Sequence, residues 1–211
     1  MNIADIRKDY TLQTLEADKV HHSPIAQFQT WLQEAIKAAL PEPTAMNIAT
    51  VSAEGKPSAR IVLLKGVENN GFIFFTNYES KKGKDLATNP FACLTFHWAE
   101  LERQVRIEGK IEKIANEQSE QYFNSRPVGS RIGAHASPQS QVIESREWLE
   151  NRVNELTATY ANKTVKRPEN WGGYILYPSL IEFWQGRASR LHDRILYTRV
   201  SSQWQINRLA P

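Results

Sequence analysis

The sequence predicts a mainly β protein with flanking helices, built around an antiparallel barrel. Several short apolar segments are joined by linkers of the kind that connect hairpins. The segment "RQVRIEGKIEKI" alternates apolar and polar residues with a period of two, as a strand with one buried face does. The strand–helix alternation of a doubly wound sheet is absent. With 211 residues, 41% of them hydrophobic, the chain is long enough to bury a sizeable core.

The N-terminal part divides into an arm and a helix. Residues 1–22 are polar and are expected to form a mobile arm, while residues 23–211 are expected to form a single domain. Ser23 is a typical N-cap residue, and Pro24 suits the first helical position. The apolar residues at helical spacing, which predict the buried face, are Ile25, Phe28, Leu32, Ile36 and Ala39. The helix is expected to end at "PEP", residues 41–43.

The middle of the chain predicts two hairpins and a short helix. "AMNIATVS" and "SARIVLLKG" flank the turn "AEGKP", and "GFIFFTN" reads as a third strand. "KKGKDLATNP" predicts a short helix that ends before Pro90. "FACLTFHW" and "RQVRIEGKIEKI" flank "AELE", and Val105, Ile107 and Ile111 share one face of the second of these strands. Arg60 and Lys65 bracket an apolar run that reads as a buried strand.

The last third predicts two helices and three closing strands. The helices are expected at about residues 116–124 and 138–161, with an irregular stretch between them. The residues placed roughly on one side of the second helix are Val142, Trp148, Leu149, Val153 and Leu156. "GGYILYPSLIEFWQG", "RILYTRV" and "WQINRLAP" read as short strands.

Composition and charge exclude several classes of protein. The net charge of +3 is too small to indicate nucleic-acid binding unless it is clustered. No stretch approaches the ~18 apolar residues of a membrane span, and "MNIADIRKDY" lacks the apolar segment of a signal peptide. The single cysteine, Cys93, lies in an apolar run and suits a reducing compartment. We therefore expect a cytoplasmic protein with no nucleic-acid or membrane partner.

Standard catalytic motifs are missing from the sequence. Residues 66–71 begin like a P-loop, but Phe72 and Ile73 stand where Lys and Ser or Thr are needed. There is no G-x-G-x-x-G and no G-x-S-x-G. The five histidines lack metal-ligand spacing, so no metal site is expected.

Two donor-rich segments and one aromatic segment remain as candidate sites. "YFNSRPVGSRIGAHASPQS", residues 122–140, has four serines, two arginines and no acid, which suits the acceptor oxygens of a phosphate. "ESKKGK" at residues 79–84 is also rich in donors. "EFWQGRASRLHDR" places Trp184 ahead of several cations. The Trp184 ring could form one side of a site for a planar ligand, and the cations could face the charged parts of that ligand. The alternative interpretations are a solvated loop, a solvated helix start and a basic hairpin. The segment "RIVLLKG" belongs with them, because Arg60 and Lys65 need an anionic partner unless both extend to water at the strand ends. Together these segments indicate two anion sites and a place for a flat ring.

Longer strings carry a resemblance to a known family. "RIVLLKG", "FFTNYESKKGKDL", "YFNSRPVGSRIGAHASPQS", "WGGYILYP", "EFWQG" and "RLHDRILY" resemble the pyridoxamine 5'-phosphate oxidases and occur in the order of that family. The resemblance implies an FMN-binding split β-barrel that works as a homodimer with FMN at the subunit interface. It also implies oxidation of pyridoxine or pyridoxamine 5'-phosphate to pyridoxal 5'-phosphate in vitamin B6 metabolism. Oxygen would accept the electrons and become hydrogen peroxide.

The resemblance also implies roles for individual residues. The matching FMN contacts are Arg60, Ile61, Val62, Leu63, Leu64, Lys65, Phe75, Thr76, Lys81, Lys82, Gln104, Gln139, Ser140, Trp184 and Arg194. The matching substrate contacts are Lys65, Tyr122, Arg126, Ser130, Arg190, Leu191 and His192. Arg190 and His192 would act at the reacting side of the substrate ring, and His192 would either transfer a proton or position the substrate. The arm residues that match a cover over the substrate are Arg7, Lys8, Asp9 and Tyr10.

Some positions depart from the family pattern. Lys81 stands where Arg is frequent, so the bidentate fork is lost there. Arg131, His135 and the "RAS" before Arg190 are also unusual. Two other functions stay open: an enzyme that uses FMN on a different substrate, and a module that binds flavin or a B6 phosphate without catalysis. A nucleic-acid binder is a weaker alternative that rests only on net charge.

Overall fold

The computed structural model describes residues 2–3 and 9–211, so the arm residues Arg7 and Lys8 lie outside the described part. Its strands form one nine-stranded sheet in which every pairing is antiparallel. The strands are β1 (Ala45–Val51), β2 (Pro57–Leu63), β3 (Gly66–Glu68), β4 (Gly71–Asn77), β5 (Phe91–Trp98), β6 (Arg103–Lys113), β7 (Trp171–Gln185), β8 (Asp193–Val200) and β9 (Gln203–Arg208). The helices are α1 (Pro24–Lys37), α2 (Lys81–Thr88), α3 (Asn116–Ser125), α4 (Val128–Ala136) and α5 (Arg146–Thr159). The prediction of a mainly β, antiparallel protein is confirmed.

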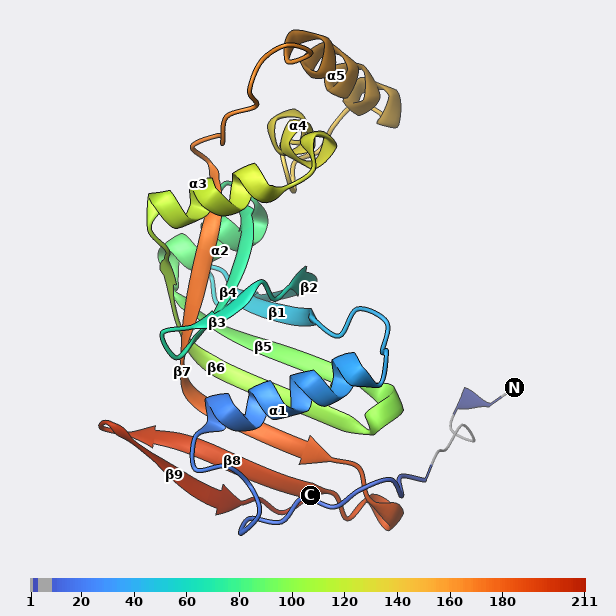
Figure 1. The fold of residues 1–211 in the computed structure, drawn as a ribbon, viewed down its shortest axis with the longest axis vertical. Helices are drawn as coiled ribbons and strands as arrows, with labels where there is room; N and C mark the ends of the chain where they lie inside the picture. The colour runs from blue at the N-terminus through green and yellow to red at the C-terminus, as the bar shows by residue number, and fades with distance from the viewer. Residues whose placement is uncertain (1, 4–8) are drawn as a thin grey trace.

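Strand β7 organises the sheet, because it is long enough to pair with different neighbours at its two ends (Figure 1). Its first residues, 171–176, pair with β4 and its last, 180–185, pair with β8, while β6 pairs with it from Tyr174 to Gln185. The closing strands are therefore not all short, as the sequence predicts, since "WGGYILYPSLIEFWQ" is one strand of 15 residues. The change of partner bends the sheet into an open barrel.

The bend coincides with an irregularity in the pairing of β6 and β7. The register shifts between Glu108 and Gly109. A Cβ at Gly109 would lie 2.1 Å from the carbonyl oxygen of Tyr177, so only glycine allows the strands to approach here. Pro178, opposite Gly109, has no N–H to donate to the ladder.

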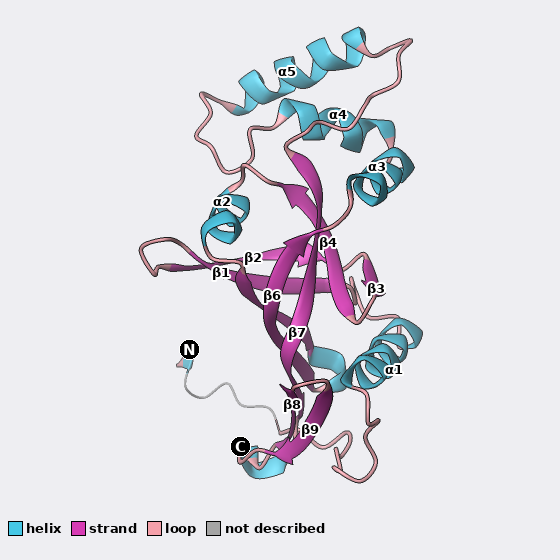
Figure 2. Ribbon diagram, turned by 90° about the vertical axis from the view of Figure 1, so that its left-hand side faces the viewer, coloured by secondary structure: helices cyan, strands magenta, loops and turns pink. Residues whose placement is uncertain are grey.

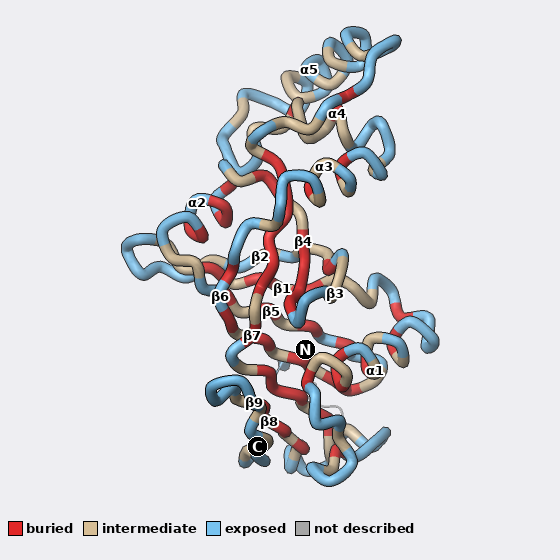
Figure 3. The backbone as a smooth tube through the Cα atoms, turned by 60° about the vertical axis from the view of Figure 1, so that its left-hand side comes forward, coloured by how far each residue is buried: buried red, intermediate tan, exposed pale blue. Residues whose placement is uncertain are grey.

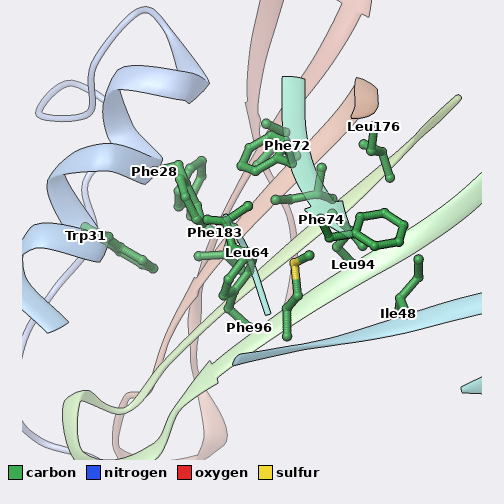
Figure 4. Close-up of a cluster of buried hydrophobic side chains, with 14 of the residues drawn as sticks. Phe28, Trp31, Ile48, Leu64, Phe72, Phe74, Leu94, Phe96, Leu176 and Phe183 are labelled. Atoms are coloured by element: carbon green, nitrogen blue, oxygen red, sulfur yellow. The ribbon is translucent and has the colours of Figure 1, made fainter. Parts of the chain in front are cut away.

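Helix α1 closes one side of the core (Figure 4). Ser23 caps the helix through its side chain and Pro24 is its first residue, as predicted. Phe28 and Trp31 point into the core, where Phe28 meets Phe72 edge-on at 4.9 Å. The predicted apolar face is wrong at Ile36, which is 54% exposed, and at Ala39, which is exposed and lies beyond the last helical residue, Lys37. The buried face runs instead through Phe28, Trp31 and Ala35.

Helices α2 to α5 gather at the end of the barrel where β7 begins (Figure 2). The segment expected to be irregular contains helix α4. The helix predicted over 138–161 begins only at Arg146, after Ser145 accepts a hydrogen bond from the N–H of Trp148. Val142 is fully exposed and belongs to no helix, and none of the residues of α5 is fully buried (Figure 3). None of the helices in residues 9–211 has the length and apolar character of a membrane span.

The described part of the arm packs against the opposite end of the barrel. The N–H groups of Thr11 and Leu12 donate to Glu102 Oε2 at 2.9 and 3.1 Å. The N–H of Leu15 donates to Asp193 Oδ2 at 3.1 Å. The arm is therefore attached, by these contacts, beside the turn that leads into β8.

Candidate active site

A cavity of about 630 Å³ lies between β2, β4 and the helices α2 to α4. The residues that line it are Arg60, Ile61, Val62, Leu63, Lys65, Phe75, Thr76, Lys82, Tyr122, Arg126, Pro127, Ser130, Gln139 and Trp171. Four of these described lining residues are cations and none is an acid. Another cavity of the same volume, beside α4 and α5, is lined by both acids and cations, including Glu79, Arg152 and Glu155. The electrostatics of the first cavity therefore favour an anion.

The cavity brings together most, but not all, of the predicted flavin and phosphate contacts. Strand β2 lies at one edge of the sheet with Ile61 65% exposed, so the prediction of a buried strand is wrong here. This exposure lets the strand face the cavity. Leu64 lies in the hydrophobic core instead, and Lys81 pairs with Asp85. Ser140 is exposed next to Gln139, with a left-handed φ of 69°.

Two cations lie at the base of the cavity. Arg60 donates from Nη1 to Thr50 Oγ1 at 2.7 Å and from Nη2 to Ser58 Oγ at 2.6 Å. Lys82 Nζ donates to Thr76 Oγ1 and Gln139 Oε1, both at 2.9 Å. Burial and the neighbouring charge of Arg60 lower the pKa of Lys82 to about 8. Arg60 and Lys82 are thus close enough to repel each other, and a bound anion would offset their charge.

Aromatic rings form one wall of the cavity. Phe75 stacks on Tyr122 with ring centres 3.8 Å apart, and Trp171 is nearly parallel to Phe75 at 5.6 Å. Arg126 lies over the Trp171 ring at 4.6 Å, and burial lowers the pKa of its guanidinium. Its Nη1 atom is buried and has no hydrogen-bond partner among the described residues. A buried donor of this kind is expected to serve a ligand.

Two lining residues, Pro127 and Trp171, have no role among the contacts that the sequence predicts, and Trp171 is the one that belongs to the aromatic wall. It opens the string "WGGYILYP", and it follows Asn170 at the start of β7. The pair Gly172 and Gly173 directly after Trp171 was the signal in the sequence that other side chains approach the strand closely here. In the structure, a Cβ at Gly173 would lie 2.9 Å from the Phe75 ring. Glycines in a strand mark such a close approach. Here Gly173 leaves room for the side chains of Ile114 and Phe75, and Gly172 leaves room for the side chain of Tyr78.

The other predicted residues form a second group at the far end of β7. Trp184 and His192 have ring centres 4.6 Å apart, and Tyr10 meets the two rings at 5.7 and 5.8 Å. Gln104 lies opposite Trp184 on β6. Arg194 Nε donates to the buried Glu182 at 2.7 Å.

The turn that carries Arg190 has an unusual backbone. Ser189 and Arg190 both adopt left-handed conformations, with φ of 55° and 60°. Such a conformation costs roughly 1–2 kcal/mol for a residue other than glycine. Leu191 is 69% exposed, and the N–H of Arg187 donates to Nδ1 of His192 at 3.1 Å. The turn therefore presents its side chains outward in a strained geometry, as functional turns do.

The two groups are separated along one strand. Gly173 pairs with Phe75 at the cavity, and Trp184 lies eleven residues further along β7. At about 3.3 Å per residue the separation along the strand is about 36 Å. A ligand of the size of the cavity that contacts both groups would therefore need two copies of the chain.

These features define a class of protein, a split barrel whose cavity is lined, among the described residues, by four cations and no acid and lies beside an aromatic wall. Residues 32–160 match the family described as pyridoxamine 5'-phosphate oxidase, and residues 171–211 match the pyridoxine 5'-phosphate oxidase C-terminal dimerisation region. The chain belongs to the pyridoxamine 5'-phosphate oxidase family. The dimerisation region supports a homodimer.

Named relatives and solved structures agree with this assignment. The chain is 58% identical to a pyridoxine/pyridoxamine 5'-phosphate oxidase of Paraburkholderia phytofirmans, over 100% of this chain and 99% of that protein. It is 59% identical to one of Burkholderia thailandensis, over 99% of both chains. The structure of PhzG from Burkholderia lata, in complex with tetrahydrophenazine-1-carboxylic acid, has a TM-score of 0.90 at 29% identity, covering 97% of this chain and 100% of PhzG. An FMN-binding protein from Nostoc punctiforme shares the fold, with a TM-score of 0.72 at 17% identity over 90% of this chain and 98% of its own.

Proposed function

We propose that the protein binds FMN and oxidises pyridoxine 5'-phosphate or pyridoxamine 5'-phosphate to pyridoxal 5'-phosphate, with oxygen as electron acceptor and hydrogen peroxide as product. The observation that carries the proposal is the cavity with four cations and no acid among its described lining residues. Full-length relatives at 58% identity named pyridoxine/pyridoxamine 5'-phosphate oxidase support this choice of substrate. Such an enzyme would act in vitamin B6 metabolism.

The donors in the cavity fit two phosphates. Arg60 and Lys82 lie together with Thr76 and Gln139, and this set would hold the phosphate of FMN. The donors assigned to the substrate phosphate are Lys65, Tyr122, Arg126 and Ser130. The unpartnered Nη1 of Arg126 suits the second phosphate, because an arginine fork meets phosphate oxygens with parallel hydrogen bonds.

When bound, FMN would supply the two-electron redox chemistry, and the protein supplies binding and orientation. Arg126 and Lys65 would fix the substrate by its phosphate, which converts an encounter into a defined geometry. The wall of Phe75, Tyr122 and Trp171 would exclude water from that side of the cavity.

His192 suits a positioning role better than that of a base. Its Nδ1 accepts the N–H of Arg187, and burial and the charge of Arg190 lower its pKa. The neutral ring therefore carries its proton on Nε2 and presents a donor there. A donor can hold an oxygen or nitrogen of the substrate, whereas a ring already protonated at Nε2 has no free lone pair there to accept a proton.

The active unit in this proposal is a homodimer. The Trp184–His192 group lies about 36 Å along β7 from the cavity, so it would complete the cavity of a second copy of the chain. The match of residues 171–211 to a dimerisation region supports this arrangement, because that region contains Trp184, Arg190, His192 and Arg194.

The alternative is a flavin enzyme for a substrate without phosphate, as the complex of PhzG with tetrahydrophenazine-1-carboxylic acid suggests for that relative. The test is peroxide formation by the purified yellow protein with pyridoxine 5'-phosphate, pyridoxine and tetrahydrophenazine-1-carboxylic acid. We expect activity with the phosphorylated substrate and little with the other two. Equal or greater activity with either of those would overturn the proposal, and a colourless protein unable to bind FMN would exclude flavin chemistry.

A further inference from the structure

Arg60 lines the cavity and is also fixed by several hydrogen bonds to the strands behind it. Its guanidinium donates to the hydroxyls of Thr50 and Ser58, and its Nη1 also reaches the carbonyl oxygen of Ile48 at 3.4 Å. Strand pairing explains these contacts, because Thr50 lies opposite Ser58 and Ile48 lies opposite Arg60 on β1 and β2. The guanidinium is thus fixed against the sheet while it lines the cavity.

The hydroxyl of Thr50 has one proton, and the structure shows where it goes. Thr50 is fully buried, and its Oγ1 donates to Asp85 Oδ2 at 2.7 Å, whereas the other acceptor found for it in the described part of the chain, the carbonyl of Ser58, is 3.5 Å away. A carboxylate accepts and does not donate. Asp85 therefore turns the lone pairs of Thr50 towards Arg60, which can only donate.

Asp85 also holds a third cation, Lys81, which is not among the residues that line the cavity. Asp85 is 5% exposed, and the Nζ of Lys81 lies 3.3 Å from both of its carboxylate oxygens. Asp85 is thus linked to Arg60 through Thr50 and directly to Lys81, and the exposed carboxylate of Glu54 also interacts with Lys81 and Asp85. With Lys82 beside Arg60, the described cations of this cluster outnumber its acids, which favours an anion such as a phosphate.

We propose that Thr50 and Asp85 are positioning residues for the phosphate of the cofactor, acting through Arg60 and Lys81. Neither residue lines the cavity. The inference rests on the proposed function, which assigns the FMN phosphate to this set of cations. The proposal also gives a role to Lys81, which does not line the cavity. Asp85 fixes the position of the Lys81 ammonium, so Lys81 adds positive charge near the phosphate without touching it.

The test compares two ligands that differ only by the phosphate. FMN and riboflavin are titrated into the full-length protein freed of flavin, and binding is followed by quenching of flavin fluorescence. The variants are Thr50→Val, which keeps the shape and removes the hydroxyl, Thr50→Ser, which keeps the hydroxyl, and Asp85→Asn. Thermal unfolding of each ligand-free variant shows that it is folded.

We expect Thr50→Val to raise the Kd of FMN about tenfold, while the Kd of riboflavin changes less than about twofold. Thr50→Ser should bind like the wild type, and Asp85→Asn should weaken FMN in the same selective way. An unchanged preference for FMN in Thr50→Val, or an equal loss for both flavins, would overturn the inference and leave the proposed function intact. A wild type that does not prefer FMN to riboflavin would instead contradict the phosphate assignment in the proposed function.

Discussion

Replacement of Arg126 tests whether the cavity recognises the phosphate of the substrate. The side chain is partly exposed, but its Nη1 is buried without a partner among the described residues, and its Cζ lies 4.6 Å from the centre of the Trp171 ring. Truncating one partner of a buried charge pair costs about 2–5 kcal/mol, and partial exposure favours the lower part of that range. A loss of about 2–3.5 kcal/mol corresponds to a roughly 30-fold to 300-fold fall in kcat/KM.

The assay measures kcat/KM for pyridoxine 5'-phosphate and for unphosphorylated pyridoxine at equal FMN occupancy. Arg126→Ala should lose activity on the phosphorylated substrate and change much less on pyridoxine, which has no phosphate to lose. Arg126→Lys should fall between, because it keeps the charge without the fork. An equal proportional loss on both substrates would show that Arg126 supports the aromatic wall or the flavin, and the phosphate reasoning would be refuted.

Three further predictions concern other parts of the proposed site. His192→Ala should lower kcat/KM by about 10-fold to 100-fold with little change in FMN affinity. His192→Gln should recover part of the activity, because its amide can donate a hydrogen bond near the position of Nε2. A Gln variant no more active than the Ala variant would indicate that His192 acts as a base. FMN affinity should fall as the pH rises through about 8, where Lys82 loses its charge, whereas riboflavin affinity should stay the same. Lys82→Arg should remove this pH dependence of FMN binding. An identical pH profile for both flavins in titrations of the wild type would disprove the prediction. Acid precipitation should release all flavin from the protein, since Cys93 and the histidines show no attachment motif, and flavin retained in the pellet would indicate a covalent link.

Local signals in the sequence predicted local structure well. Ser23 and Pro24 define the start of α1 through a cap and a fixed φ, which depend on neighbouring residues only. The last helix was predicted to start at Pro138, which is wrong. The residue that caps its N-terminus is Ser145, seven residues later. The intervening chain is used otherwise, as the Gln139 side chain reaches Lys82.

Features set by packing between distant segments could not be predicted in this way. The buried face of α1 includes Trp31 rather than Ile36, because the position of the helix on the sheet decides which side chains are covered. Trp171 joins the cavity because β7 pairs with β4, and no spacing in the sequence shows that pairing. The resemblance supplied a list of site residues, but the division of that list into two groups became visible only in the fold.

That division follows from the construction of β7. A strand of 15 residues that pairs with β4 at one end and β8 at the other carries its two ends far apart, and no turn lies between them to bring them together. The anion cavity and aromatic wall belong to one end, whereas Trp184 and the strained turn with Arg190 and His192 belong to the other. In the proposed enzyme each chain therefore contributes half of two sites.

Dissociation of the dimer should then abolish substrate oxidation even if every residue of each chain stays folded. Sedimentation across a dilution series, with activity measured on the same samples, should show the two losses together. Full activity in a monomeric fraction would mean that the two groups serve separate purposes.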